Sequence, residues 1–115
     1  MPALISFSPE AVVWQDHPLF VGVRIAWLVS GALSDGPYTC ALVEMADDAV
    51  VPEHVHQNED DVLYVLKGRA RMEICGAPEV ELRPGSFLRV PKNTRHRPFD
   101  FSGGFTIYDF WATNP

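Results

Sequence analysis

His54-Val55-His56-Gln57-Asn58-Glu59-Asp60-Asp61 holds two histidines one residue apart, followed by a run of acidic residues. Side chains of an extended strand alternate between its two faces, so His54 and His56 share a face, roughly 6–7 Å apart along the strand. Both imidazoles can reach one ion at the usual ~2.0–2.2 Å. Asp61 follows a short polar turn and can return to the same ion from the next strand. His96 comes just beyond Pro91, so three of the four histidines form one constellation and predict a metal site.

Composition indicates one globular domain over residues 1–115. With 47% hydrophobic and 21% charged residues, the chain has material for a single core. A net charge of −6 argues against a nucleic-acid partner, which needs basic surface. No apolar run reaches the ~20 residues that cross a bilayer, because Arg24 interrupts the best candidate. The first residues, 1–5, do not resemble an export leader. We therefore expect a cytoplasmic protein with no membrane partner.

The two cysteines have no metal-type spacing between them. Cys40 and Cys75 both lie on strand-like segments. We expect them to be reduced residues of the interior or the pocket, with one disulfide as the alternative.

Strand signals run through nearly the whole chain, because ten prolines and eight glycines divide it into short β-rich pieces. Residues 69–74 alternate strictly, which turns Ala70, Met72 and Ile74 inward. A single helical turn is expected near Pro9. Many short strands indicate a sandwich or a barrel. The expected strands are 21–29, 38–45, 61–66, 70–75, 79–82, 87–90 and 105–111, with turns at 31–37, 67–68, 76–78, 84–85 and 102–104.

With these motifs the chain resembles the cupins, small all-β double-stranded β-helix or jelly-roll barrels that hold a metal or a small ligand. Their first motif has two histidines flanking one residue, then a glutamate and a glycine. The second motif has a glycine, a proline, a second glycine, a histidine and an asparagine. In this chain the two motifs are carried by His54, His56, Asp61 and Gly68, and by Gly85, Pro91, Asn93, His96 and Asp100. The resemblance covers about residues 38–111. It implies a barrel there, with strands of residues 1–30 packing on the barrel or on a partner subunit.

Asp61 is the departure from the cupin pattern that matters most. Aspartate is one methylene shorter than glutamate, so its carboxylate can stop about 1.5 Å short of an ion. We consider both direct ligation and a contact through water, and favour the indirect role. Glu59 and Asp60 are the substitutes, but the strand phase of Asp61 points inward. Asn93 replaces a turn glycine, and asparagine tolerates the left-handed conformation.

The resemblance implies one divalent transition metal ion, such as iron, manganese, nickel or zinc, held by His54, His56, His96 and Asp61. An ion with open positions can polarise a carbonyl or hold a substrate. Our leading hypothesis is a metal-dependent enzyme of the dioxygenase, isomerase or lyase type, acting on a small oxygenated metabolite such as an organic acid or acidic sugar. The alternative is a sugar- or effector-binding protein without turnover.

Other residues receive less specific interpretations. His17 is expected to be a solvated loop histidine. Arg89 and Arg97 are expected to form exposed ion pairs, with an acidic substrate as the alternative partner. The aromatic residues are expected in the core and on a dimer face, with some lining the pocket. The apolar segment 3–7 predicts a homodimer formed by sheet augmentation or by face packing, because a barrel of this size cannot easily bury the segment alone and exposed strand edges need covering.

Overall fold

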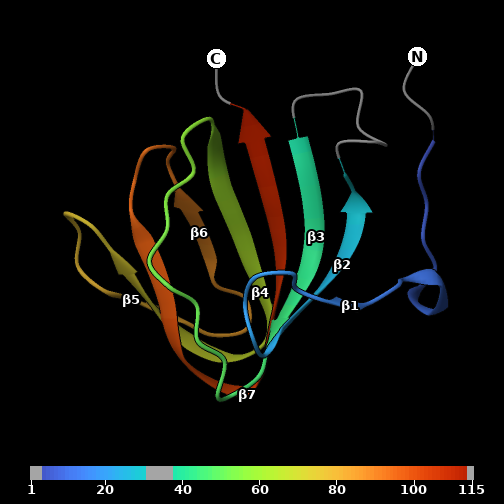
Figure 1. Cartoon of the computed structure of the whole chain (residues 1–115), viewed down its shortest axis with the longest axis horizontal. Helices are drawn as coiled ribbons and strands as arrows, with labels where there is room; N and C mark the ends of the chain where they lie inside the picture. Colours follow the sequence, from blue (N-terminus) through green and yellow to red (C-terminus); the bar gives the residue numbers. More distant parts are fainter. Residues whose placement is uncertain (1–3, 31–37, 114–115) are drawn as a thin grey trace.

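The computed structural model describes residues 4–30 and 38–113, which are built almost wholly from antiparallel strands (Figure 1). The all-β jelly-roll prediction is confirmed. The elements are a 3-10 turn η1 (Pro9–Ala11) and strands β1 (Gln15–Asp16), β2 (Val23–Val29), β3 (Tyr38–Met45), β4 (Glu59–Ile74), β5 (Val80–Leu82), β6 (Phe87–Val90) and β7 (His96–Thr113).

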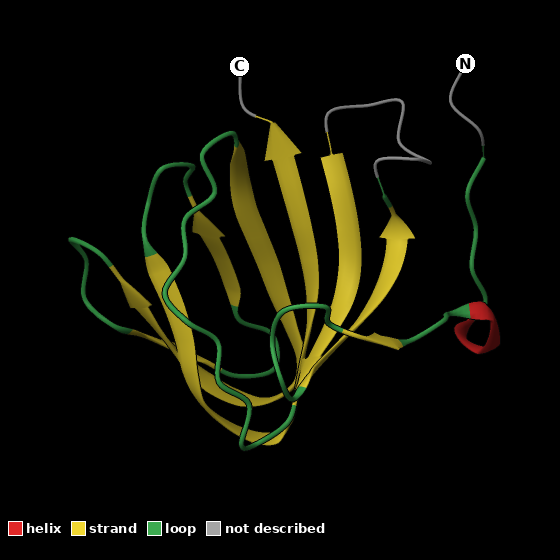
Figure 2. Cartoon of the chain, in the orientation of Figure 1, coloured by secondary structure: helices red, strands yellow, loops and turns green. Residues whose placement is uncertain are grey.

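Two long strands, β4 and β7, organise the fold. They pair with each other over most of their length, in the sheet order β1-β2-β3-β7-β4-β5, with β6 on β4. The first half of β4 pairs with β6 and its second half with β5. Figure 2 shows the strands curving around a central space. Each long strand therefore contributes to both walls of the barrel.

The turns expected at 67–68 and 102–104 are wrong. Both positions lie inside the long strands, where the register shifts between the pairs Lys67↔Thr106 and Arg69↔Ser102. Gly68 has φ +75, and a Cβ there would lie 2.6 Å from the Ser102 carbonyl oxygen and 2.7 Å from the Phe105 backbone. Only glycine permits this approach. These glycines mark bulges that bend paired strands, which is another use of glycine in β-structure.

The core follows the expected alternation. Leu63 and Val65 of β4 face inward with Ala70 and Met72, and they pack in one cluster with Phe105 of β7. The prediction of two interior cysteines is half wrong: Cys40 is buried, whereas Cys75 is exposed after β4 ends. Neither is in a disulfide within the part of the chain that the structure describes.

The N-terminal part adds to the barrel wall. The turn expected near Pro9 is present as η1. β2 pairs antiparallel with β3 from Val23↔Met45 onward, which extends the sheet beyond β7. The turn expected at 31–37 lies outside the described residues, as does Ala3 of the apolar segment.

Candidate metal centre

Backbone hydrogen bonds tie the histidine loop to the start of β7. His54 and His96 form an isolated antiparallel bridge, in which each N–H donates to the other's carbonyl oxygen at 3.0 Å. The Asn93 N–H donates to the His56 carbonyl at 2.7 Å. Asn93 has φ +63, the left-handed conformation expected for the glycine it replaces. The backbone alone therefore brings the two motifs together.

Two of the imidazoles are oriented by neighbouring carbonyl groups. His54 Nδ1 lies 3.0 Å from the Pro52 carbonyl oxygen, and His96 Nδ1 lies 2.9 Å from that of Thr94. A carbonyl only accepts, so each Nδ1 carries the hydrogen and each Nε2 keeps its lone pair. Metal-bound histidines are commonly oriented in this way.

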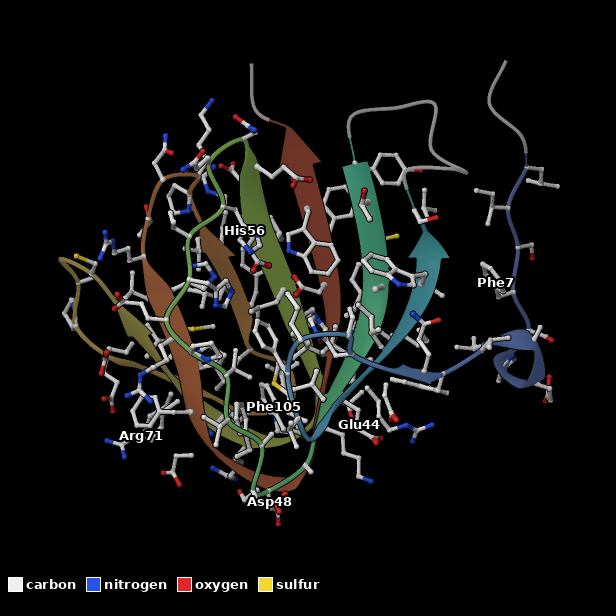
Figure 3. The ribbon with its side chains drawn as sticks, viewed as in Figure 1. Phe7, Glu44, Asp48, His56, Arg71 and Phe105 are labelled. Atoms are coloured by element: carbon white, nitrogen blue, oxygen red, sulfur yellow. The ribbon has the colours of Figure 1, made fainter. Side chains whose placement is uncertain are left out.

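The four residues singled out from the sequence meet at one point. His54, His56, Asp61 and His96 each offer a ligand atom, and these atoms lie within 4.8 Å of one another. Asp61 Oδ2 lies 3.5 Å from Nε2 of both His56 and His96. Two ligand atoms that each lie ~2.1 Å from one ion, with about 90–110° between them at the ion, are roughly 3–3.5 Å apart. The measured distances therefore suit ligands that share one ion. Figure 3 shows His56 turned towards the space between the strands.

Buried polar atoms without partners show that the site fits an ion. Nε2 of His56, Nε2 of His96 and Oδ1 of Asp61 are buried and have no hydrogen-bond partner among the described residues. An unsatisfied buried polar group costs about 1–3 kcal/mol, so three in one place call for a shared partner. Two imidazole nitrogens and a carboxylate oxygen are typical donors for a divalent transition metal.

The electrostatics of the site keep Asp61 ionised. Burial alone would raise the pKa of Asp61, but its hydrogen bond with Asp109 and its contacts with His56 and His96 hold that pKa well below the usual range. Burial would lower the pKa of His96, yet Asp61 and the Thr94 carbonyl raise it. For His54, burial prevails and lowers the pKa. An anionic carboxylate among imidazoles suits a cation.

Asp109 is a site residue that the sequence reasoning missed. It is buried on β7 between Ile107 and Trp111, opposite Leu63 of β4. Burial, and then the negative charge of Asp61, raise the pKa of Asp109 well above its usual range. The raised pKa favours the protonated form of Asp109, which can donate a hydrogen bond to the Asp61 carboxylate. Its strand phase, inward between two large apolar residues, was the available signal.

The substitutes considered for Asp61 lie elsewhere. Asp60 accepts a hydrogen bond from the Lys92 backbone N–H at 2.9 Å, and neither it nor Glu59 belongs to the group of four. Of the two arginines, Arg97 pairs with Glu73 at 3.2 Å on the outer surface. Arg89 is exposed on β6, and neither arginine lines the cavity beside the site.

A cavity of about 330 Å³ adjoins the four residues and opens past the segment before β2. His17 lies in a loop, as expected, but it is only partly exposed and lines the mouth of this cavity. The ring stacks on Phe20 at 4.5 Å, and its Nδ1 accepts hydrogen bonds from the backbone N–H groups of Leu19 and Phe20. Phe20 in turn lies 6.2 Å from the His54 ring. This segment therefore joins the mouth of the cavity to the histidine cluster.

A cupin-domain family model matches residues 41–101, which is more than half of the chain and includes all four clustered residues. The chain is a cupin. Among curated proteins, quercetin 2,3-dioxygenase of Bacillus subtilis (strain 168) is 33% identical over 63 residues. That match covers 55% of this cupin and only 18% of the dioxygenase.

Solved structures agree on the fold. KdgF from Halomonas sp. superposes with a TM-score of 0.78 at 22% identity, covering 95% of this cupin and 94% of that chain. A predicted oxalate decarboxylase from Thermotoga maritima superposes with a TM-score of 0.80 at 15% identity, covering 97% and 100% of the two chains. Within the described residues, no helix has the length and apolar character needed to cross a membrane.

Proposed function

We propose that this cupin binds one divalent transition metal ion through His54, His56, His96 and Asp61, and is a metal-dependent enzyme acting on a small oxygenated metabolite. The observation that carries the proposal is the convergence of three buried, unpartnered donor atoms on one point beside a cavity. Iron, manganese, nickel and zinc are all compatible with this mixture of nitrogen and oxygen ligands.

Asp61 is assigned here as a direct ligand, in place of the water-mediated role favoured from the sequence. Its Oδ2 already stands 3.5 Å from two imidazole nitrogens, the spacing of ligands on one ion. Protonated Asp109, buried against Asp61, can donate a hydrogen bond that holds this carboxylate in place, so we assign Asp109 as a positioning residue. An ion held there supplies Lewis acidity and open positions for substrate oxygens. The imidazole rings and the surrounding barrel keep bulk water from the donor atoms.

The test is metal content. His96→Ala should lose the metal and keep its circular dichroism spectrum, because the core is apolar and closes without the site. His17→Ala is the matched control, since His17 lines the same cavity but lies outside the group of four. Stoichiometric metal in His96→Ala by plasma spectrometry would refute the assignment. A metal-free preparation then separates the two classes: an enzyme loses turnover completely, whereas a sugar or effector binder keeps affinity through hydrogen bonds.

We also propose that the cupin is a homodimer whose interface is the outer face of β4, β6 and β7. Tyr64 pairs across the strands with Phe87 and Tyr108, and Leu66 follows on the same face. Tyr64, Leu66 and Phe87 expose 46%, 48% and 66% of their surface. At ~150–250 Å² for a full aromatic side chain, these three offer roughly 300 Å².

A standard interface buries ~800 Å² on each partner, so these three side chains supply more than a third of one. Phe110 stacks on Tyr38 at 5.1 Å and continues the apolar surface across β7 to β3. A second copy is the occupant, because the apolar face is continuous over adjacent strands and can meet its own equivalent across a two-fold axis. Leu4 and Phe7 are also exposed, and they line a hollow beside β2 and β3 together with Tyr38. Two free cysteines also favour a reducing, cytoplasmic location.

A further inference from the structure

We infer that the cavity selects a compact, uncharged molecule that carries an apolar ring and two adjacent oxygen atoms, and that Trp111 donates a hydrogen bond to one of those oxygens. This inference rests on the proposed metal site and names its ligand class. It departs from the organic acid or acidic sugar suggested by sequence alone.

The wall of the cavity is apolar beyond the four clustered residues. Side chains from β2, β3, β4 and β7 meet there, including Val43, Met45, Met72 and Phe105. Figure 3 shows Phe105 inside the barrel, whereas Arg71 lies on the outside. Thioether sulfurs and an aromatic ring contact flat rings favourably. A hydroxyl-rich sugar would lose its hydrogen bonds to water against this wall, and each buried hydroxyl left unpaired would weaken its binding.

Positive charge is missing from the cavity wall. Among the described residues that line it, none is lysine or arginine, and the ionisable groups besides histidines are the carboxyls of Asp61 and Asp109. The arginines nearest to the second motif are used on the surface, where Arg95 pairs with Glu53 and Arg97 with Glu73. A ligand carboxylate that is not one of the two adjacent oxygen atoms facing the metal site would be buried without a positively charged partner. Such burial would weaken binding.

The volume limits the size of the ligand. At about 330 Å³ the cavity lies at the lower end of small-molecule sites. One water occupies ~30 Å³ in the liquid. If each non-hydrogen atom of a ligand takes the same volume, the cavity holds roughly eleven such atoms. A single substituted ring fits, and a fused multi-ring molecule would extend through the mouth past His17 and Phe20.

Trp111 supplies a donor that the protein itself leaves unused. Its side chain lines the cavity, and its Nε1 is buried without a hydrogen-bond partner among the described residues. Trp111 lies directly opposite Asp61 in the β4–β7 register, so both side chains leave the sheet on the same face. A ligand oxygen beside Asp61 would therefore satisfy the indole N–H, whereas a ligand with apolar edges would leave it unpaired.

The experiment uses zinc-loaded protein and a matched pair of probes, 4-methylcatechol and 3,4-dihydroxybenzoate. They share the ring and the adjacent oxygens, and differ by a methyl against a carboxylate. Isothermal titration calorimetry should show 4-methylcatechol binding at least tenfold more tightly. D-glucuronate, the acidic-sugar probe, should bind more weakly still. Zinc content measured after each titration shows that the probes have not removed the ion.

Trp111→Phe tests the donor separately. It keeps an aromatic ring but removes the N–H, so affinity for 4-methylcatechol should fall about 3–10-fold while zinc content stays stoichiometric. Trp27→Phe is the matched control, because Trp27 packs on Trp111 at 5.9 Å but does not line the cavity. Unchanged affinity in Trp111→Phe overturns the role of the indole.

The outcomes separate this inference from the metal proposal. If zinc binds stoichiometrically but the carboxylate probe or glucuronate binds as tightly as 4-methylcatechol, the ligand class is wrong and the metal site stands. If zinc binds but none of the three probes binds, the ligand class is also wrong and the metal site stands. If the protein holds no zinc, the proposed function fails, and this inference fails with it.

Discussion

Replacing Gly68 with alanine should destabilise the barrel strongly, because β4 and β7 touch there through their backbones. The added Cβ would meet the Ser102 carbonyl oxygen at 2.6 Å and the Phe105 Cα and N at 2.7 Å. These atoms belong to the main chain of a paired strand, so no side chain can rotate away. Gly76→Ala is the matched control, since Gly76 has a similar positive φ of +80 but open space around it.

The expected magnitude follows from comparing the two sites. Both substitutions place a Cβ in the left-handed region, at about 1–2 kcal/mol. Only Gly68→Ala also forces two strands apart, and overpacking of this kind costs about 1–3 kcal/mol more. We therefore expect a loss of roughly 2–5 kcal/mol for Gly68→Ala and about 1–2 kcal/mol for Gly76→Ala.

The assay is urea unfolding followed by tryptophan fluorescence, with the slope of free energy against urea compared between variants. Equal losses in the two variants would refute the argument, because they would show that conformation alone makes glycine necessary at position 68. A loss confined to Gly76→Ala would refute it as well.

Three further predictions concern the site, the outer face and one tyrosine. Asp61→Ala should lose metal as completely as His96→Ala, and Asp61→Glu should bind metal less tightly than wild type. Both losses of affinity should exceed the ~10–100-fold that follows from changing a residue that only supports a ligand. The measurement is competition with a chelator, and tighter metal binding by Asp61→Glu would restore the water-mediated role. Light scattering at micromolar concentration should give twice the 12.8 kDa chain mass. Phe87→Glu should give monomer and the exposed-loop control Val50→Glu should not, and a wild-type monomer would exclude the dimer. Burial and Cys40 raise the pKa of Tyr108 to about 12. Because this lies above the unfolded value of ~10, stability should hold below pH ~10 and fall as pH rises towards 12, an effect that Tyr108→Phe removes. Ultraviolet titration of every tyrosine near pH 10 would contradict the shift.

The barrel and the cluster of four were predictable because both depend on local spacing. Three local properties were enough: two histidines one residue apart on an extended segment, a carboxylate five residues later, and an inward strand phase for that carboxylate. The alternation of Ala70 and Met72 likewise determined which face is buried, as the structure confirms. His96 lies forty residues after His56, so local spacing could not place it at the site. The second cupin motif made that prediction.

The features that were missed depend on contacts between distant segments. Gly68 was interpreted as a turn because glycine also ends strands, and only the approach of Phe105 shows that it is a bulge. His17 precedes the barrel in sequence, and only the fold brings it to the cavity mouth. Asp109 had an inward phase, but its importance comes from lying against Asp61, on a strand paired far along the chain.

The pairing of β3 with β7 sets an order of events during synthesis. Tyr38 pairs with Ala112, so β3 cannot pair with β7 along its full length until more than seventy further residues have been made. At ~5–20 residues per second, a ribosome takes roughly 4–15 s to supply them. During that interval β2 and β3 can form only a hairpin, to which the short β1 adds two residue pairs, and a hairpin on its own is marginally stable in water. The nascent chain should therefore stay susceptible to proteases until β7 emerges, and its paired strands should then become resistant in one step.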